Sequence, residues 1–237
     1  MKTILFTLSF LWFFACKDNK STSQKIIQEA VEKHGGKHYD NLDISFNFRS
    51  YSFHIQNIDN HYLYTRTTQD SLGNSISDVL KDGLFERKIN DKKESLSTKE
   101  IDKYKEGTNS VAYFVLLPYK LLDPAVNSQL IGTATIDGKT YNKIKVWFDK
   151  AGGGKDHDDV FTYWFNTETK KLDYLAYDNG GPRFRKAIRR DTIKGIVFQN
   201  YENYEITEKG INTWEYDKAF QEGKAKLLSK IEQSNYK

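Results

Sequence analysis

Much of the sequence consists of short segments in which apolar and polar residues alternate, and this pattern restricts the possible folds. In "LDISFNF", residues 42–48, Ile44, Phe46 and Phe48 alternate with polar side chains, which is the period of a β-strand with one buried face. Similar segments follow at "SFHIQNI", "HYLYTRT", "SISDVL" and "LFERKIN", separated by turn signals such as "LGN" and "KDG". Strands joined by such short turns pair antiparallel, because a parallel crossover needs about a dozen residues or more. The pattern predicts an antiparallel meander.

A helix is predicted before the first strand. Apolar residues recur at helical spacing between a capping box, formed by Ser21 and Gln24, and the stop signal Gly35-Gly36. We expect His34, in the last turn, to interact with the negative end of the helix dipole.

A second helical segment is predicted over residues 97–123. It opens with another capping box, Ser97 and Glu100, and continues into the apolar run "VAYFVLLPYKLLDPAV". Pro118 and Pro124 must break or kink that run. We therefore expect two helical pieces packed on the sheet.

Strands resume after this insertion, at "QLIGTATI", "YNKIKVWF", "DVFTYWFN", "KLDYLAY", "FRKAIRR" and "GIVFQNYENYEI". The segment "VFTYWF" is apolar or aromatic on both faces, so we expect it inside the sheet or lining a pocket. In "RFRKAIRR", residues 183–190, Arg183, Arg185 and Arg189 should share one face, which either contacts an anionic partner or is simply solvated. A short helix near residues 214–222 precedes either a last strand or more helix.

Strands on both sides of a helical insertion predict an α+β fold, with a large antiparallel β-sheet packed on an N-terminal helix and a central helical segment. The chain has no internal repeat, no long linker and only 3 prolines. We therefore expect residues 25–237 to form a single domain.

The N-terminus has the pattern of a removable leader. After Lys2, the run "ILFTLSFLWFF" is too short to cross a hydrocarbon core, which needs about 20 apolar residues, and this pattern is typical of a secretory signal peptide. "FFAC" resembles a bacterial lipobox, in which the chain is cut before a cysteine that then carries a lipid. We predict a signal peptide over residues 1–15, lipid attachment at Cys16 and a polar tether over residues 16–24. An ordinary signal peptide cut nearby is the alternative.

Charge and cysteine content exclude several kinds of partner. Cys16 is the only cysteine, so the chain forms no intrachain disulfide and no multi-thiolate metal site. Its 36 basic and 32 acidic residues are interspersed, as on a solvated surface rather than a nucleic-acid interface. We expect no cofactor and no nucleic-acid partner. The membrane, reached through the lipid on Cys16, is the predicted partner.

One polar cluster has the residue types of a metal site. Asp156, His157, Asp158 and Asp159 lie in the glycine-rich segment "AGGGKDHDD", and such oxygen and nitrogen atoms bind divalent cations. Adjacent carboxylates on a strand point to opposite faces, however, and no second histidine lies at a metal-site interval. We expect a solvated loop and no metal. An envelope metal-assisted hydrolase that uses this cluster is the alternative function.

Aromatic residues of the second half, with the central segment, are the candidates for lining an apolar cavity. The candidate ligand-binding residues are Tyr113, Phe114, Leu117, Trp147, Phe161, Tyr163, Trp164, Phe165 and Tyr174. The alternative is that they fill an ordinary packed core.

The order of "EKHGG", "LDISFNFR", "LLPYKLLDPAV", "IDGKTYNKIKV" and "YWFNTETKKLDYLAY" resembles a family of Bacteroidota lipoproteins built on a domain of unknown function. That family is similar in turn to LolA/LolB-type lipoprotein carriers. The resemblance implies a sheet curled into a half-barrel around helices, with acyl chains on its concave face.

We therefore expect a non-enzymatic, lipid-anchored protein of the cell envelope, in the outer membrane, that binds a lipid or other apolar ligand. A structural or partner-binding lipoprotein with a filled core is a further alternative, since a fold does not fix a function. The segment "KDN" after Cys16 resembles a signal that sends some such lipoproteins to the cell surface. A plain tether explains it equally well, so the membrane face stays open.

Overall fold

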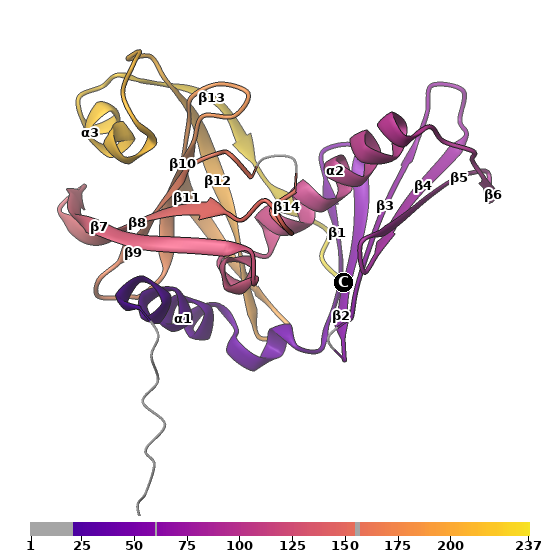
Figure 1. Ribbon diagram of the computed structural model, residues 1–237, viewed down its shortest axis with the longest axis horizontal. Coiled ribbons are helices and arrows are strands. Elements are labelled where there is room, and N and C mark those ends of the chain that lie inside the picture. The colour runs from indigo at the N-terminus through magenta and orange to yellow at the C-terminus, as the bar shows by residue number, and fades with distance from the viewer. Residues whose placement is uncertain (1–20, 60, 155–156) are drawn as a thin grey trace, which may run out of the picture.

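The computed structural model describes residues 21–59, 61–154 and 157–237, and its first half forms an antiparallel sheet (Figure 1). Within the described residues, its order is β14-β1-β2-β3-β4-β5-β6. Its strands are β1 (Leu42–Phe48), β2 (Tyr51–Ile58), β3 (His61–Gln69), β4 (Ser75–Lys81), β5 (Leu84–Ile89), β6 (Lys92–Lys93) and β14 (Gln233–Ser234). Ile44 lies opposite Ile55, and Phe46 opposite Phe53, so the register gathers the apolar side chains on one face. The predicted meander is confirmed.

The second half forms another antiparallel sheet, with the order β13-β12-β11-β10-β9-β8-β7 over the residues described. Its strands are β7 (Val126–Ile136), β8 (Lys139–Phe148), β9 (Phe161–Asn166), β10 (Leu172–Tyr177), β11 (Arg183–Ile193), β12 (Ile196–Ile206) and β13 (Ala225–Ile231). The α+β class and the curled, half-barrel-like arrangement are confirmed. The strands form two sheets rather than one, and the central helical segment lies between β6 and β7 along the chain.

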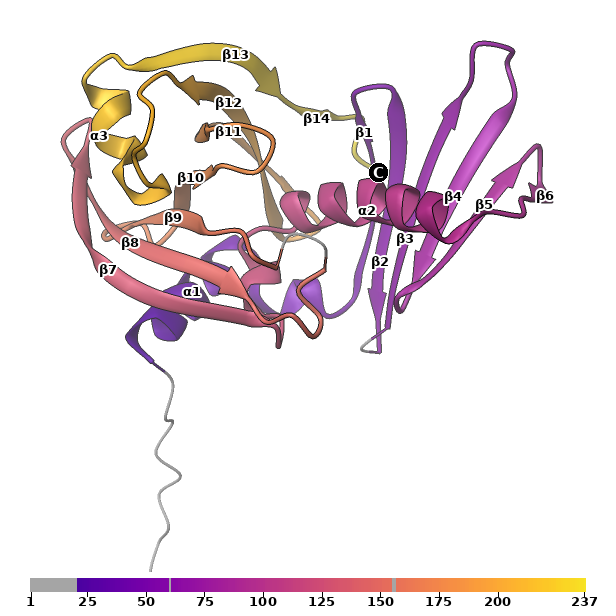
Figure 2. The same ribbon diagram turned by 45° about the horizontal axis from the view of Figure 1, so that its top comes forward.

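The C-terminal segment joins the two sheets. β13 pairs with β12 in the second sheet, and the chain then passes into β14, which pairs with β1 in the first. The backbones of Ser45 and Lys237 also exchange two hydrogen bonds, of 3.2 and 3.0 Å. Edges of both sheets are thus held by one continuous stretch of chain (Figure 2).

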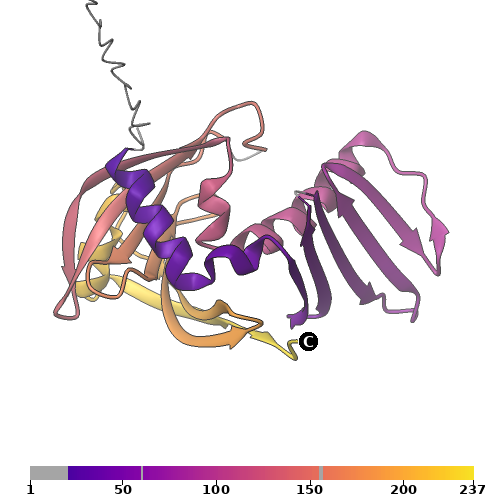
Figure 3. The ribbon, with the colours of Figure 1, turned by 90° about the horizontal axis from the view of Figure 1, so that it is seen from below.

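Both predicted capping boxes are present. In the first, Ser21 N donates to Gln24 Oε1 at 2.9 Å and Gln24 N to Ser21 Oγ at 3.3 Å, and α1 (Thr22–His34) follows. The helix therefore begins inside the predicted tether, over residues 22–24. α1 packs against β7 and β12, and the 3₁₀ turn η1 (Gly36–Tyr39) leads from it into the first sheet (Figure 3).

The central segment forms two helical pieces, as predicted. Ser97 and Glu100 cap α2 (Thr98–Val115), and the 3₁₀ turn η2 (Tyr119–Leu122) follows Pro118. α2 lies across β3, β4 and β5 of the first sheet, and its C-terminal end reaches the second sheet (Figure 2). This position makes α2 the element between the two sheets.

His34 does not play the expected role at the helix dipole. The residue is fully buried, and burial together with the nearby Arg190 charge lowers its pKa to about 3. The ring is therefore uncharged at neutral pH. Its Nε2 accepts the backbone N–H of Leu172 at 3.3 Å, which ties α1 to the start of β10.

Apolar side chains form two clusters, one on each face of the second sheet. The larger lies among α1, α2 and both sheets, and includes Ile44, Leu116 and Tyr163. The smaller lies between the second sheet and α3 (Tyr216–Gln221), which follows the 3₁₀ turn η3 (Thr213–Glu215), and includes Trp164 and Phe184. Since both of its faces are covered, β9 is buried along almost its whole length. Its predicted interior position is confirmed.

The predicted shared face of Arg183, Arg185 and Arg189 is wrong. The pairing of β11 with β12 shifts register between Ala187 and Arg189, and such a bulge reverses the alternation of side chains beyond it. Arg189 is consequently exposed and paired with Asp191 at 3.0 Å, whereas Arg185 contacts Phe114 of α2.

Candidate functional site

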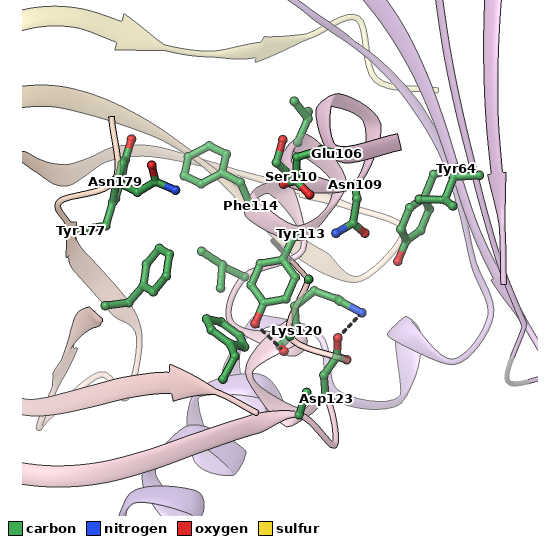
Figure 4. A pocket seen from close by; sticks show the side chains of 18 of the residues that line it. Tyr64, Glu106, Asn109, Ser110, Tyr113, Phe114, Lys120, Asp123, Tyr177 and Asn179 are labelled. Atoms are coloured by element: carbon green, nitrogen blue, oxygen red, sulfur yellow. Dashed lines mark hydrogen bonds and ion pairs between the residues drawn. The ribbon is translucent and has the colours of Figure 1, made fainter. Parts of the chain in front are cut away.

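A cavity of about 670 Å³ lies where α2 meets the two sheets (Figure 4). This volume is within the range of about 300–1,000 Å³ that is usual for small-molecule sites. The first sheet contributes Phe48, Tyr64 and Leu80 to its wall, and the second contributes Phe161 and Leu175. The site therefore depends on how the two halves of the chain come together.

Five of the nine candidate ligand-binding residues line this cavity: Tyr113, Phe114, Leu117, Phe161 and Tyr163. The first three come from α2 and the residues after it, and the last two from one face of β9. Phe114 lies 5.0 Å from Tyr201, and Phe161 lies 5.7 Å from Phe148, measured between ring centroids. These five residues therefore line the cavity, and Leu117 and Tyr163 also pack in the larger apolar cluster.

The other four candidates lie away from the cavity. Phe165 is buried in the larger cluster, whereas Trp164 and Tyr174 pack with Phe184 in the smaller one, behind the sheet. Trp147 follows the core residue Val146 on β8 and points to the opposite face. The sequence did not distinguish these four residues from the five that line the cavity, because a strand covered on both faces is apolar at every position.

Tyr113 is held rigidly in the cavity wall. Its hydroxyl donates to the backbone oxygen of Lys120 at 3.0 Å, and its ring stands edge-on to Phe148 with 6.0 Å between centroids. Burial raises the pKa of Tyr113, so the hydroxyl stays protonated. Lys120 in turn forms an ion pair with Asp123, and both interactions are drawn in Figure 4.

Polar side chains complete the lining. Asn109 and Ser110 come from α2, and Tyr177 and Asn179 come from the end of β10 and the turn after it (Figure 4). An apolar wall with a few polar groups is the usual composition of a site for a small organic ligand.

Arg185 is a cavity residue that was not among the sequence candidates. It projects from β11, its guanidinium lies 4.3 Å from the Phe114 ring centroid and 4.9 Å from that of Tyr177, and it donates a hydrogen bond to the Tyr177 hydroxyl. Burial lowers the pKa of Arg185. The sequence showed Arg185 within a run of basic residues. It did not predict the bulge that puts Arg185 and Arg189 on opposite faces of the strand.

Among the described residues, no group of three or more side chains of the metal-binding types is assembled, and this holds for the described part of the predicted Asp156–Asp159 cluster. Asp156 lies outside the described residues. His157 Nε2 is 3.1 Å from Asp158 Oδ1, and the Asp158 side chain is 91% exposed. Asp159 lies in the same loop, before β9.

The chain belongs to DUF6503, a family of unknown function, whose family model matches residues 2–233. No curated protein matches it.

None of the helices in the described residues is both long and apolar enough to cross a membrane.

Several solved structures are similar to the chain. A LolA superfamily protein from Nitrosomonas europaea is 12% identical, with a TM-score of 0.47, over 92% of this chain and 94% of that one. A DUF1329 family protein from Desulfovibrio piger is 10% identical, with a TM-score of 0.40, over 92% and 93%. The lipoprotein LppX from Mycobacterium tuberculosis is 15% identical, with a TM-score of 0.29, over 65% and 86%.

Proposed function

We propose that this protein is a non-enzymatic binding protein that buries an apolar molecule, such as a lipid acyl chain, in the cavity between α2 and the two sheets. The observation that carries the proposal is the cavity itself: about 670 Å³ with aromatic walls from both sheets. Each methylene group moved from water into such a wall contributes about 0.8 kcal/mol. A hydrocarbon chain is the ligand that gains most from this surface.

The proposal also places the protein at a membrane of the cell envelope, the outer membrane, through a lipid on Cys16. This part rests on the sequence, because residues 1–20 lie outside the described residues. Ser21, the α1 cap, is five residues beyond Cys16, and five steps of fully extended chain span at most about 18 Å. A lipid on Cys16 would therefore keep the folded body close to the bilayer from which an apolar ligand would come.

Mass spectrometry of lipids extracted from the gently purified full chain tests the proposal. We expect a bound apolar compound in stoichiometric amount. The variant Ser110→Trp places a large ring on the α2 side of the cavity and should lower that amount severalfold. Ser71→Trp, at an exposed position in the β3–β4 turn, is the matched control and should keep it.

Equal lipid content in the wild-type chain and Ser110→Trp, with both folded by circular dichroism, would contradict binding in this cavity. So would a wild-type chain that carries no apolar compound and binds none when acyl chains are added.

A further inference from the structure

Among the described residues, four cationic side chains line the cavity, and their surroundings differ. Lys120 is paired with Asp123, and Lys105 donates to the backbone oxygen of Gly83 at 2.8 Å. Arg49 lies in the exposed β1–β2 turn, where water solvates its charge. Arg185 differs from all three, because its charge is inside the cavity wall.

Arg185 has no carboxylate partner among the residues that the structure describes. Its hydrogen-bond partner there is the hydroxyl of Tyr177. Its Nε is buried and has no hydrogen-bond partner. A guanidinium carries five N–H donors and stays protonated in proteins, so most of its hydrogen-bonding capacity is unused in the described residues.

The surroundings of Arg185 also fix its orientation. The guanidinium is 4.3 Å from the ring centroid of Phe114 on α2 and 4.9 Å from that of Tyr177 on β10. These cation–π contacts offset part of the cost of burying the charge, but they leave the N–H edge without an anion. An oriented fork of this kind matches a carboxylate or a phosphate, which accept two parallel hydrogen bonds from it.

We infer that Arg185 binds the negatively charged headgroup of the ligand, and that the cavity therefore takes an anionic amphiphile: a carboxylate or phosphate on a hydrocarbon chain. The hydrocarbon would lie along Phe161 and Tyr163, which line the same cavity on the neighbouring part of the sheet. This inference rests on the proposed function, since it names the class of molecule that the same cavity binds.

Three probes that share a sixteen-carbon chain distinguish the contribution of the headgroup to affinity from that of the tail. They are palmitate, hexadecyl phosphate and the uncharged hexadecanol. For the full chain we expect palmitate or hexadecyl phosphate to bind about 10-fold to 100-fold more tightly than hexadecanol, which is the contribution of charge-assisted hydrogen bonds. The preference between the two anions then distinguishes a fatty acid from a phosphate headgroup.

Arg185→Met should remove this preference and leave hexadecanol binding unchanged, because a methionine keeps an apolar wall. Arg185→Lys should keep part of it, since an ammonium retains the charge without the fork. Arg189→Met, at an exposed arginine of the same strand that lies outside the cavity, is the matched control and should keep the full preference. Circular dichroism and thermal unfolding establish that each variant is folded.

Equal affinity of the wild-type chain for hexadecanol and both anions would overturn the role of Arg185 and leave the proposed function standing. A preference that survives in Arg185→Met would overturn it as well. Failure of all three probes to bind would overturn the proposed function together with the inference.

Discussion

Asp78 in β4 accepts two hydrogen bonds from Arg66 in β3, and this pair lies directly under α2. Arg87 of β5 donates to the same carboxylate at 2.6 and 2.9 Å. The α2 residue Tyr104 covers the network: its backbone oxygen accepts from Arg66 at 3.5 Å, and its ring lies over the Arg87 guanidinium. One carboxylate thus fixes two arginines against the helix that forms a wall of the cavity.

Replacing Asp78 with alanine should lower the free energy of unfolding by about 3–5 kcal/mol, because it leaves without their counter-ion two arginines whose side chains are only 11% and 12% exposed. The Asp78 side chain is only 2% exposed. Urea unfolding measures the change. Glu86→Gln is the control: Glu86 pairs with Lys88 and Lys93 on the surface, where water screens the ion pairs, so its loss should change the free energy of unfolding far less. Similar losses in the two variants would argue against a supporting role of Asp78 under α2.

Trp164→Phe should separate fold stability from ligand binding. Trp164 is fully buried in the smaller cluster, with 5.3 Å between its ring centroid and that of Phe184, so the variant should be destabilised by about 1–3 kcal/mol. Its content of bound apolar compound should stay at the wild-type level. Phe161→Ala, on the cavity side of the same strand, should change that content. A loss of ligand in Trp164→Phe with the fold retained would mean that the binding site extends behind the sheet.

His34 should make stability depend on pH. Its pKa is lowered to about 3 in the folded protein, against about 6.5 when unfolded. Between these values the unfolded chain binds the proton and the folded chain does not, so stability is full above pH 6.5 and falls as the pH drops towards 3. The loss between pH 8 and pH 5 should be about 2 kcal/mol.

The comparison of His34→Gln with the wild-type chain isolates this effect. Glutamine retains an acceptor for the Leu172 N–H but does not titrate. The difference in free energy of unfolding between pH 8 and pH 5 should therefore shrink by about 2 kcal/mol in this variant. His61→Gln, at a histidine whose side chain is 70% exposed, should keep the pH dependence of the wild-type chain. An unchanged pH dependence in His34→Gln would show that other groups cause it.

Cys16→Ala should abolish labelling by a fatty-acid probe and release the protein from the membrane fraction, because a lipid at Cys16 is the proposed anchor. Western blotting of soluble and membrane fractions gives the second readout. A variant that stays membrane-bound without the lipid would contradict the anchor. A labelled variant would place the lipid elsewhere on the chain.

Local structure was largely predictable from the residues. Alternating side chains predicted the strands, and the Ser21–Gln24 and Ser97–Glu100 pairs predicted where both helices begin. These features depend on neighbours a few positions apart. The face to which each aromatic points was predictable only in part: Tyr163 and Trp164 are adjacent and equally buried, yet one lines the cavity and the other packs behind the sheet.

The antiparallel strands, the helix caps and the α+β class follow from the order of residues alone, because the period of side chains and the length of turns are local properties. The three-dimensional packing places α2 between two sheets, makes Phe48 and Phe161 enclose one cavity, and lets Arg185 enter it while Arg189 does not. Those outcomes depend on packing between distant segments and on a single bulge in β11, and neither leaves a periodic signal in the chain.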